Sequence, residues 1–289
     1  MYQDSKGRKW FKGNLHTHTT VSDGVLSPEE ACRLYQAEGY DFLALTDHWA
    51  FHPGGEWEGM TLLSGCEYDV SRGAGLGTYH TVAIGMERAP KLTRLASVQQ
   101  VINAIHRCGG IAIYAHPAWS LNTTRQLIAL KRVDAAEIFN SVSDYPRNCR
   151  ADSGLLLDIL AKKGKVWNLT AADDAHFYEE SDRCRSYIMV QTERCDRESL
   201  LTAIRAGNFY ATQGPRLVTC LEDGRVKVDC SPVSRITYFT DTPWSAHRSD
   251  VGEGLCSGEY VPSEADSVVR VEAVDAQGRR AWSQYIRVR

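Results

Sequence analysis

The sequence predicts an α/β fold followed by a small all-β domain. Apolar runs of strand length alternate with helical segments up to residue 213. Beyond Gln213-Gly214-Pro215 the helical periodicity stops, and short apolar runs separated by turns such as Glu222-Asp223-Gly224 remain. Alternating strands and helices favour parallel β/α construction, whereas several short strands with intervening turns favour an all-β unit. We therefore predict a β/α barrel over residues 1–213 and a sandwich-like all-β domain over residues 214–289.

Capping residues mark where the predicted helices begin. Ser27 with Glu30, and Ser97 with Gln100, have the spacing of a capping box, and Asp196 can cap a further helix. These signals, together with apolar residues at helical spacing, predict helices at residues 28–38, 97–108, 123–131, 151–163 and 197–206.

Apolar runs between these helices predict the strands. In the first domain they lie at residues 10–15, 41–48, 61–68, 80–85, 110–116, 135–140, 165–170 and 185–192. In the second they lie at residues 217–221, 226–230, 236–240, 268–274 and 282–288. Residues 73–77 form a glycine-rich turn, but the Gly-Lys-Ser/Thr pattern of a phosphate-binding loop is missing.

Histidines and carboxylates recur at the ends of these apolar runs. His16 and His18 are two residues apart after the opening strand, so both imidazoles can share one face, and Asp23 follows within a turn. Similar residues end or open later runs: His48, Glu67, His80, His116, Asp174 and His176. Barrel folds keep their chemistry at the carboxyl ends of strands, and a closed barrel brings such residues together most simply. Imidazole and carboxylate ligands suit zinc, manganese or iron.

Composition excludes several classes of protein. The chain is 43% hydrophobic and 24% charged, which is ordinary for a globular protein. Its net charge of −3 gives no support for binding extended nucleic acid. We find no apolar run of the length of a signal peptide or a membrane span. The nine cysteines contain no Cys-X-X-Cys pair, which favours reduced thiols and a cytoplasmic location.

Taken in order, these motifs resemble the PHP family, named for polymerase and histidinol phosphatase. The resemblance covers residues 13–212 and rests on His16-Thr17-His18, Asp23-Gly24, Thr46-Asp47-His48, Glu67, His80, Ala115-His116-Pro117 and Asp174-Ala175-His176. The all-β tail, with residues 270–275 and 280–283, resembles a module of the PHP subgroup that includes CehA/McbA-type metallohydrolases. The family implies a distorted seven-stranded (β/α)7 barrel with two or three divalent metal ions at the strand ends.

The resemblance also implies which residues bind each ion. The first ion would take His16, His18, Glu67 and Asp174. Glu67 would bridge to a second ion, which His80 and His116 complete, and a third would take Asp23, His48 and His176. All nine positions hold the ligand type that the family has. In such a trinuclear centre Asp23, Glu67 and His176 would lie nearest to a metal-bound hydroxide.

A centre of this kind predicts a metal-dependent phosphoesterase. Metal ions lower the pKa of a bound water and stabilise charge on phosphoryl oxygens, so hydroxide can attack a small phosphate ester of the nucleotide or sugar phosphate type. Asn140, at a strand end, and Arg183 and Arg185 are candidates for contacting the substrate. Asp47 and Asp173 adjoin ligands, and each either orients its neighbour or caps a turn.

Other functions use the same residues. The CehA-type resemblance permits hydrolysis of a carboxylic or carbamate ester, because the same hydroxide can attack a carbonyl carbon. A nuclease acting on DNA ends is a further alternative, disfavoured by the absence of basic runs. A non-catalytic, metal-binding structural module is the remaining one. The sequence leaves the oligomeric state open.

Overall fold

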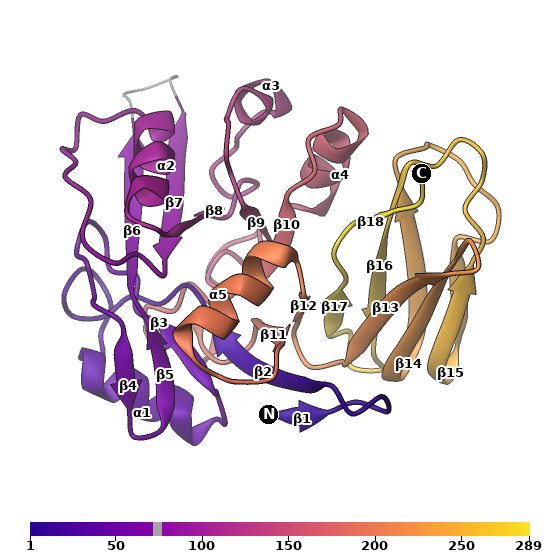
Figure 1. Ribbon diagram of the computed structural model, residues 1–289, viewed down its shortest axis with the longest axis horizontal. Helices are drawn as coiled ribbons and strands as arrows, with labels where there is room; N and C mark the ends of the chain where they lie inside the picture. The colour runs from indigo at the N-terminus through magenta and orange to yellow at the C-terminus, as the bar shows by residue number, and fades with distance from the viewer. Residues whose placement is uncertain (72–76) are drawn as a thin grey trace.

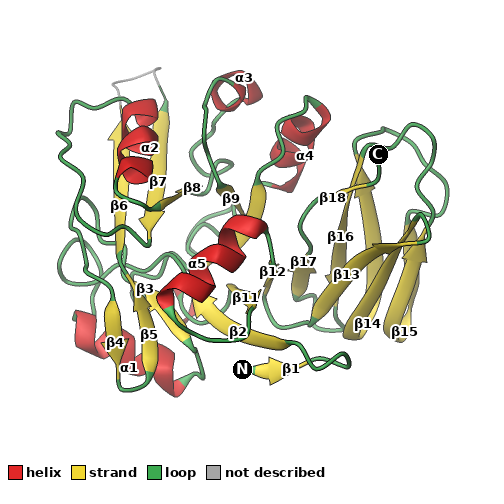
Figure 2. Cartoon of the chain, in the orientation of Figure 1, coloured by secondary structure: helices red, strands yellow, loops and turns green. Residues whose placement is uncertain are grey.

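The computed structural model describes residues 1–71 and 77–289, so most of the predicted glycine-rich turn at residues 73–77 lies outside the described residues. The chain is a mixed α/β protein in which the β-rich C-terminal part lies to one side of the helices (Figures 1 and 2). Among the described helices, none combines the length and the apolar composition that crossing a membrane requires.

The helices begin where the capping residues predict. Ser27 and Ser97 each accept a hydrogen bond from the backbone N–H three residues later, and Glu30 and Gln100 complete the two capping boxes. Two helices are shorter than predicted, at residues 124–128 and 154–162. The α-helices of the described residues are α1 (Pro28–Ala37), α2 (Val98–Arg107), α3 (Thr124–Ile128), α4 (Gly154–Lys162) and α5 (Arg197–Ala206), with a 3₁₀ turn at Glu180–Asp182.

The strands form two sheets. The smaller sheet contains β6 (Gly65–Ser71), β7 (Thr78–Ile84), β8 (Ile111–Tyr114), β9 (Ala135–Asn140) and β10 (Asn168–Ala172), in the order β10-β9-β8-β7-β6. The first-domain strands of the larger sheet are β1 (Tyr2–Gln3), β2 (Lys9–Asn14), β3 (Phe42–Ala44), β4 (Gly55–Trp57), β5 (Met60–Leu63), β11 (Tyr187–Gln191) and β12 (Phe209–Thr212). Its tail strands are β13 (Leu217–Glu222), β14 (Arg225–Thr240), β15 (Ser249–Tyr260), β16 (Val268–Val274), β17 (Arg280–Trp282) and β18 (Ile286–Arg287).

The predicted closed barrel is not formed by the strand pairing of the described residues. Among the described residues, the backbone pairing between the two sheets consists of isolated bridges: Thr17 to Ala175, His48 to Glu67 and His52 to Gly65. Pairing is also not uniformly parallel, because β7 runs antiparallel to both β6 and β8. The connection between Ser71 and Thr78 has hairpin length, whereas a parallel pair needs a crossover of a dozen residues or more.

In the described structure the tail is joined to the larger sheet by strand pairing, and the division into domains at residues 213 and 214 stays a prediction. The tail strands continue the larger sheet, because Ala211 and Thr212 of β12 pair with Trp282 and Ala281 of β17. β14 runs through both of the strands predicted at 226–230 and 236–240. The sequence analysis missed β15, whose three glycines and charged residues give it little strand propensity.

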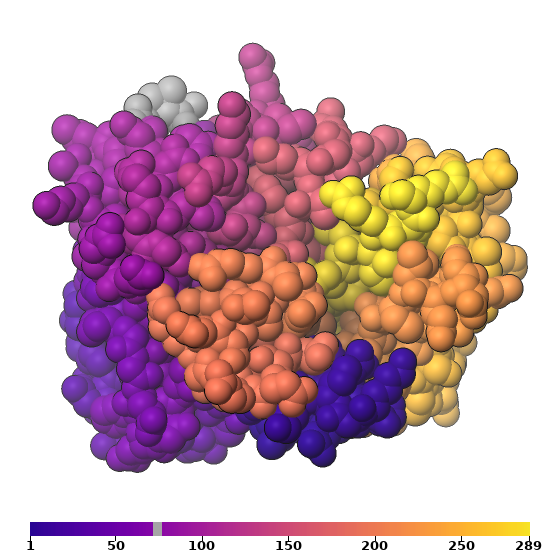
Figure 3. All heavy atoms as spheres, in the orientation of Figure 1, coloured from indigo at the N-terminus to yellow at the C-terminus, as the bar shows by residue number. Residues whose placement is uncertain are grey.

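Side-chain contacts also attach the tail to the α/β part. The ring of Trp282 is fully buried and stacks on Phe139 of β9, with ring centroids 5.5 Å apart. The guanidinium of Arg270 makes two hydrogen bonds, of 2.7 and 2.6 Å, to the carboxylate of Asp158 on α4. The space-filling view shows the tail packed directly against the middle of the chain (Figure 3).

Replacing Trp282 by alanine tests how far stability depends on this contact. Because the side chain is fully buried, its loss leaves a cavity, and we expect the free energy of unfolding to fall by about 3–5 kcal/mol. Urea unfolding followed by circular dichroism measures the change. Trp244→Ala is the matched control, since Trp244 is 81% exposed and its loss should change stability by about 0.5 kcal/mol or less.

Candidate metal centre

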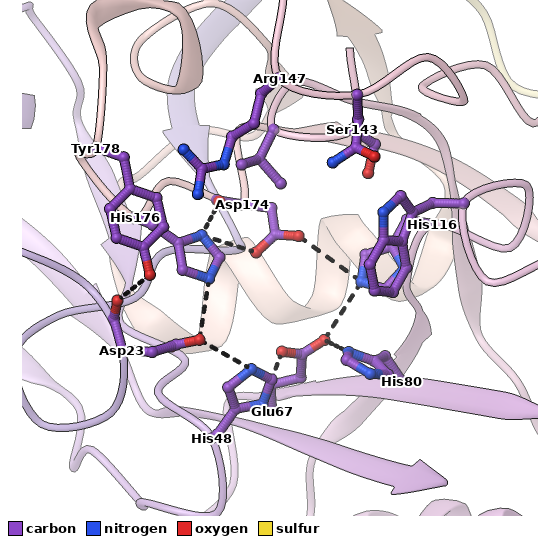
Figure 4. Close-up of a pocket in the computed structure, with 13 residues that line it drawn as sticks. Asp23, His48, Glu67, His80, His116, Ser143, Arg147, Asp174, His176 and Tyr178 are labelled. Atoms are coloured by element: carbon purple, nitrogen blue, oxygen red, sulfur yellow. Dashed lines mark hydrogen bonds and ion pairs between the residues drawn. The ribbon is translucent and has the colours of Figure 1, made fainter.

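The nine predicted ligand residues converge where the two sheets meet. A cavity of about 310 Å³ is lined by seven of them, Asp23, His48, Glu67, His80, His116, Asp174 and His176 (Figure 4). The other two, His16 and His18, are fully buried next to Glu67 and Asp174. The structure therefore brings together all of the side chains that the sequence proposed as metal ligands.

Bridges between the sheets place the first ligands. His16 and His18 follow the end of β2, and the residue between them, Thr17, pairs with Ala175. His48 follows β3 and pairs in the same way with Glu67 of β6. Two strand ends from the larger sheet thus meet ligand-bearing segments of the smaller sheet.

The β6–β7 hairpin places the next pair. Asp69 lies directly opposite His80 in the register of this hairpin, and Glu67 is two residues earlier on the same face of β6. His80 is therefore the diagonal neighbour of Glu67, within reach of a long side chain. The distance from His80 Nδ1 to Glu67 Oε1 is 2.9 Å.

Two ligands have a left-handed backbone that is uncommon for residues other than glycine. His116, directly after β8, has φ 28°, and Asp174, after β10, has φ 54°. Such conformations cost of order 1–3 kcal/mol each and persist only where surrounding contacts hold them. These two ligands are therefore held in place by the residues around them.

The donor atoms fall into overlapping groups, each with its ligand atoms within 4.8 Å of one another. Two groups are buried and share one histidine: His16, His18 and Asp174, and His16, Glu67 and His116. A third contains His48, Glu67 and His80, and the group nearest the cavity mouth contains His18, Asp23, His48 and His176. Mixed imidazole and carboxylate groups of this kind are typical sites for zinc, manganese or iron.

Unpaired polar atoms in the cluster fit bound cations. The Oδ1 atom of Asp174 and the Nδ1 atom of His48 are buried and have charged neighbours at 3.0 to 3.2 Å, but neither forms a well-aligned hydrogen bond. The Nε2 atoms of His16 and His18 face each other at 3.2 Å, and both also face Asp174. Buried polar atoms are rarely left unpaired, so lone pairs that point at a common centre are best explained as metal ligands.

The same geometry shifts the pKa values of the cluster. Burial alone would lower the pKa of His18, but hydrogen bonds to Asp174 and Glu67 and the charges of these carboxylates raise it to about 9. The pKa of His16 is likewise raised well above its ordinary value, against burial, by Asp174, Glu67 and Glu137. Burial disfavours the carboxylate of Glu67, yet the surrounding histidines hold its pKa well below the usual range.

Asp47 and Asp173 orient the segments that carry the ligands. Asp47 accepts hydrogen bonds from the backbone N–H groups and hydroxyls of Thr19 and Ser22, and its Oδ2 atom lies 2.6 Å from His52 Nε2. This fixes the loop between His18 and Asp23. The same carboxylate also pairs with His52, in the loop that follows His48.

Asp173 fixes the segment on the other side of the cluster. Its carboxylate accepts from the backbone N–H groups of Cys184, Arg185 and Ser186 and from the hydroxyl of Tyr35. Burial nevertheless raises the pKa of Asp173 to about 6. Both aspartates therefore hold backbone segments that lie next to candidate ligands.

The proposed substrate contacts lie in different surroundings. Asn140 is fully buried behind the ligands, and its side-chain N–H donates to Glu137 and to Asp174 at 2.8 and 3.1 Å. Arg183 pairs with Glu180, and Arg185 pairs with Asp144. None of these three is among the described residues that line the cavity.

Other residues line the cavity beside the ligands. The lining includes Trp119, Ser143, Arg147, Asn148 and Tyr178, none of which the sequence analysis singled out. They belong to loops after β8, β9 and β10, where no periodic pattern predicts which side chain turns inward. Only their position in the sequence could have pointed to them, because loops that follow the ends of strands often carry binding residues.

Comparisons with known proteins agree with this architecture. No family model matches the chain. A structure from Bacteroides vulgatus, of a two-domain protein containing a predicted PHP-like metal-dependent phosphoesterase, matches 99% of this chain and 98% of its own, with a TM-score of 0.56 and 14% identity. The chain has a PHP-like fold. An amidohydrolase from Chromobacterium violaceum matches 58% of this chain and 89% of its own, with a TM-score of 0.44 and 16% identity.

A sequence relative covers a shorter part of the chain. A 5'-3' exoribonuclease from Haemophilus influenzae is 35% identical over 99 residues, which are 32% of this PHP-like chain and 35% of the relative. The chain thus spans about a third of the length of that relative. The CehA-type resemblance of the tail is not confirmed by these comparisons and stays a prediction.

Metal binding should compete with protons at this cluster. A histidine ligates only when the ligating nitrogen is unprotonated, and the pKa of His18 near 9 keeps its ring charged in the apo-protein at neutral pH. We therefore expect Zn²⁺ to displace protons below pH 9, its apparent affinity to rise between pH 6 and 9, and the rise to level off above. Calorimetry in two buffers of different ionisation enthalpy measures the protons released.

His106 provides the control for this experiment. Its pKa is also raised, by the hydrogen bond to Asp134, but it lies on α2 and belongs to none of the ligand groups. His106→Gln should leave the proton release unchanged. A pH-independent affinity in the unmodified protein would contradict the assignment of these histidines as ligands.

Proposed function

We propose that the protein is a metal-dependent phosphoesterase that hydrolyses a small phosphate ester of the nucleotide or sugar phosphate type. The observation that carries this proposal is a free cation, the guanidinium of Arg147, in a cavity lined by metal-ligating residues. Two or three divalent ions, zinc, manganese or iron, fit the ligand groups described above.

Arg147 is the only arginine or lysine among the described residues that line the cavity. Its guanidinium lies over the ring of Tyr178, 4.1 Å from the centroid, and the described carboxylates form no salt bridge with it. Figure 4 shows it directed toward Asp174 and His176. A phosphate group offers such a cation anionic oxygens in a geometry that allows two parallel hydrogen bonds, whereas a neutral carboxylic or carbamate ester offers a carbonyl oxygen without negative charge.

The residues around the cavity would have different roles in binding the metal ions and the substrate. Divalent ions in the ligand groups would supply the Lewis acidity that lowers the pKa of a water molecule and offsets charge on phosphoryl oxygens. Arg147 would bind the phosphate through its guanidinium, and Ser143 and Asn148 offer neutral hydrogen-bonding groups in the same cavity lining. Trp119 packs edge-on against His116, 4.9 Å between centroids, and forms an apolar wall for the rest of the substrate.

The exoribonuclease relative supports a phosphate ester as the bond that is broken, because RNA is held together by phosphate esters. We extend only the bond type to this chain, since the match spans about a third of either protein. The nine cysteines are all described and all free, which supports a cytoplasmic location. Asn140, Arg183 and Arg185, the substrate contacts expected from the sequence, bond to other residues and do not line the cavity, so we do not include them among the contacts of the phosphate.

A variant of Arg147 tests which bond the enzyme breaks. We expect Arg147→Ala to lower kcat/KM for aryl phosphates roughly 10- to 100-fold, because a hydrogen bond to a charged group is worth about 1.5–3 kcal/mol. Activity on an aryl carboxylic ester, if present, should not change. Arg183→Ala is the matched control, since Arg183 bonds to exposed Glu180 and should alter kcat/KM less than about twofold.

The outcome that contradicts the proposal is equally specific. If the enzyme, loaded in turn with Mn²⁺, Zn²⁺ or Fe²⁺ and shown to hold metal, cleaves aryl esters but none of a panel of phosphomonoesters, the CehA-type alternative replaces it. Unchanged phosphate turnover in Arg147→Ala would remove the role given to that arginine.

Ligand variants separate an enzyme from a structural module. We expect His16→Ala and Glu67→Ala each to abolish phosphoesterase activity, since each residue belongs to two of the donor groups. Metal content by mass spectrometry and activity are measured on the same samples. A structural module would show no metal-dependent activity in the unmodified protein, whatever its metal content.

A further inference from the structure

Glu137 is a buried carboxylate that the ligand assignment does not use. It lies in the middle of β9, in the apolar run Ala135-Ala136-Glu137-Ile138-Phe139, and is 1% exposed. A charge in such a place is costly unless it is paired and hydrogen-bonded. Its contacts therefore indicate what it does.

Both carboxylate oxygens of Glu137 contact residues of the metal centre. Oε1 lies 2.8 Å from Nδ1 of His16. Oε2 accepts a hydrogen bond from the backbone N–H of His116 at 2.9 Å, and a second from the side-chain N–H of Asn140 at 2.8 Å. Asn140 in turn donates to Oδ2 of Asp174 at 3.1 Å. One side chain thus holds three ligands, two directly and one through Asn140.

These contacts set the orientation of each ligand. A carboxylate can only accept, so the ring of His16 presents Nδ1–H to Glu137 and leaves Nε2 for the cluster, where it lies 3.3 Å from Glu67 and 3.1 Å from Asp174. The hydrogen bond to His116 stabilises the backbone where φ is 28°. A carboxylate behind a histidine ligand fixes its tautomer and raises its basicity.

Glu137 touches the buried side of the cluster only. His16, His116 and Asp174 belong to the two buried donor groups that share His16. The group at the cavity mouth, with Asp23, His48 and His176, is supported instead by the loop that Asp47 holds. Apart from His18, which belongs to a group on each side, the two sides of the centre therefore have different supports.

We propose that Glu137 is a positioning residue that sets the metal affinity of the two buried donor groups. This inference rests on the metal centre of the proposed function but not on its substrate. If Glu137 has this role, the two buried groups bind metal with the higher affinity, and the metal affinity of the group at the cavity mouth depends on Asp47 instead.

Glu137→Gln tests this with little change of volume. A glutamine amide can accept from His16 through its oxygen, but its nitrogen then faces two N–H donors, from His116 and Asn140, and cannot satisfy them. We expect the affinity of the apo-protein for its tightest Zn²⁺ to fall roughly 10- to 100-fold, measured by competition with a chromophoric chelator. The visible absorption of the Co²⁺-loaded protein should change as well, because the orientation of His16 changes.

Asp266→Asn is the matched control. Asp266 is as buried as Glu137, and its carboxylate accepts hydrogen bonds from Tyr260, Thr242 and the backbone of Ser263, all in the tail. Its loss should lower thermal stability but leave Zn²⁺ affinity and the Co²⁺ spectrum unchanged. If Glu137→Gln does not fold, Glu137→Asp takes its place. The shorter aspartate cannot reach His16 and the His116 backbone together, so the same loss is expected.

The outcomes are separable. An affinity of the Glu137 variant within twofold of the unmodified protein, with the same Co²⁺ spectrum, would overturn the inference. So would a loss of affinity that the Asp266 control shows equally, because it would then follow from general destabilisation. If the unmodified protein binds no metal at all, the metal centre itself fails, whereas normal binding without phosphoesterase activity removes only the proposed function.

Discussion

The structure depends on the electrostatic balance between buried carboxylates and the histidines around them. Glu67 and Asp174 lie in the interior, where an isolated carboxylate would be strongly destabilising. His16 and His18 face both of them at 3.0 to 3.3 Å. Either protonated imidazoles or cations must neutralise this charge, so the site is built to exchange one for the other. The strand ends, the bridges between the sheets and the strained backbone at His116 all serve this convergence.

Local chemistry made much of the fold predictable. Ser27 and Ser97 marked helix starts because a capping box acts within four residues, and the helix after Asp196 has the bounds that its cap and final glycine predict. Sheet closure was not predictable in this way. It depends on pairing between residues far apart in sequence, and the short connection after Ser71 forces an antiparallel hairpin that interrupts a parallel barrel. The long strands of the tail could not be predicted either, since β15 contains glycines, which have a low propensity to form strands.

In the candidate site, too, some residues could be predicted from local sequence and others could not. Residues such as His48 and His116 could be proposed as ligands because each follows an apolar strand, and strand ends meet. Glu137 was missed, although a single carboxylate inside an apolar strand is itself a signal of buried pairing. Arg147 lies in an irregular loop, and no pattern in the sequence distinguishes it from Arg183 or Arg185. Which of several loop arginines faces the cavity is decided by tertiary packing alone.

The pairing of β12 with β17 joins the C-terminal segment to the rest of the molecule by backbone hydrogen bonds. A chain cut after residue 213 would expose the edge of β12 and remove Trp282 from the back of Phe139, which is two residues from Glu137. If this segment were exchanged for that of a homologous protein, the new segment would have to form the same backbone hydrogen bonds with β12, and a suitable linker alone would not be enough. The tail is therefore a structural part of the α/β unit, and any change in β17 has to keep its pairing with β12.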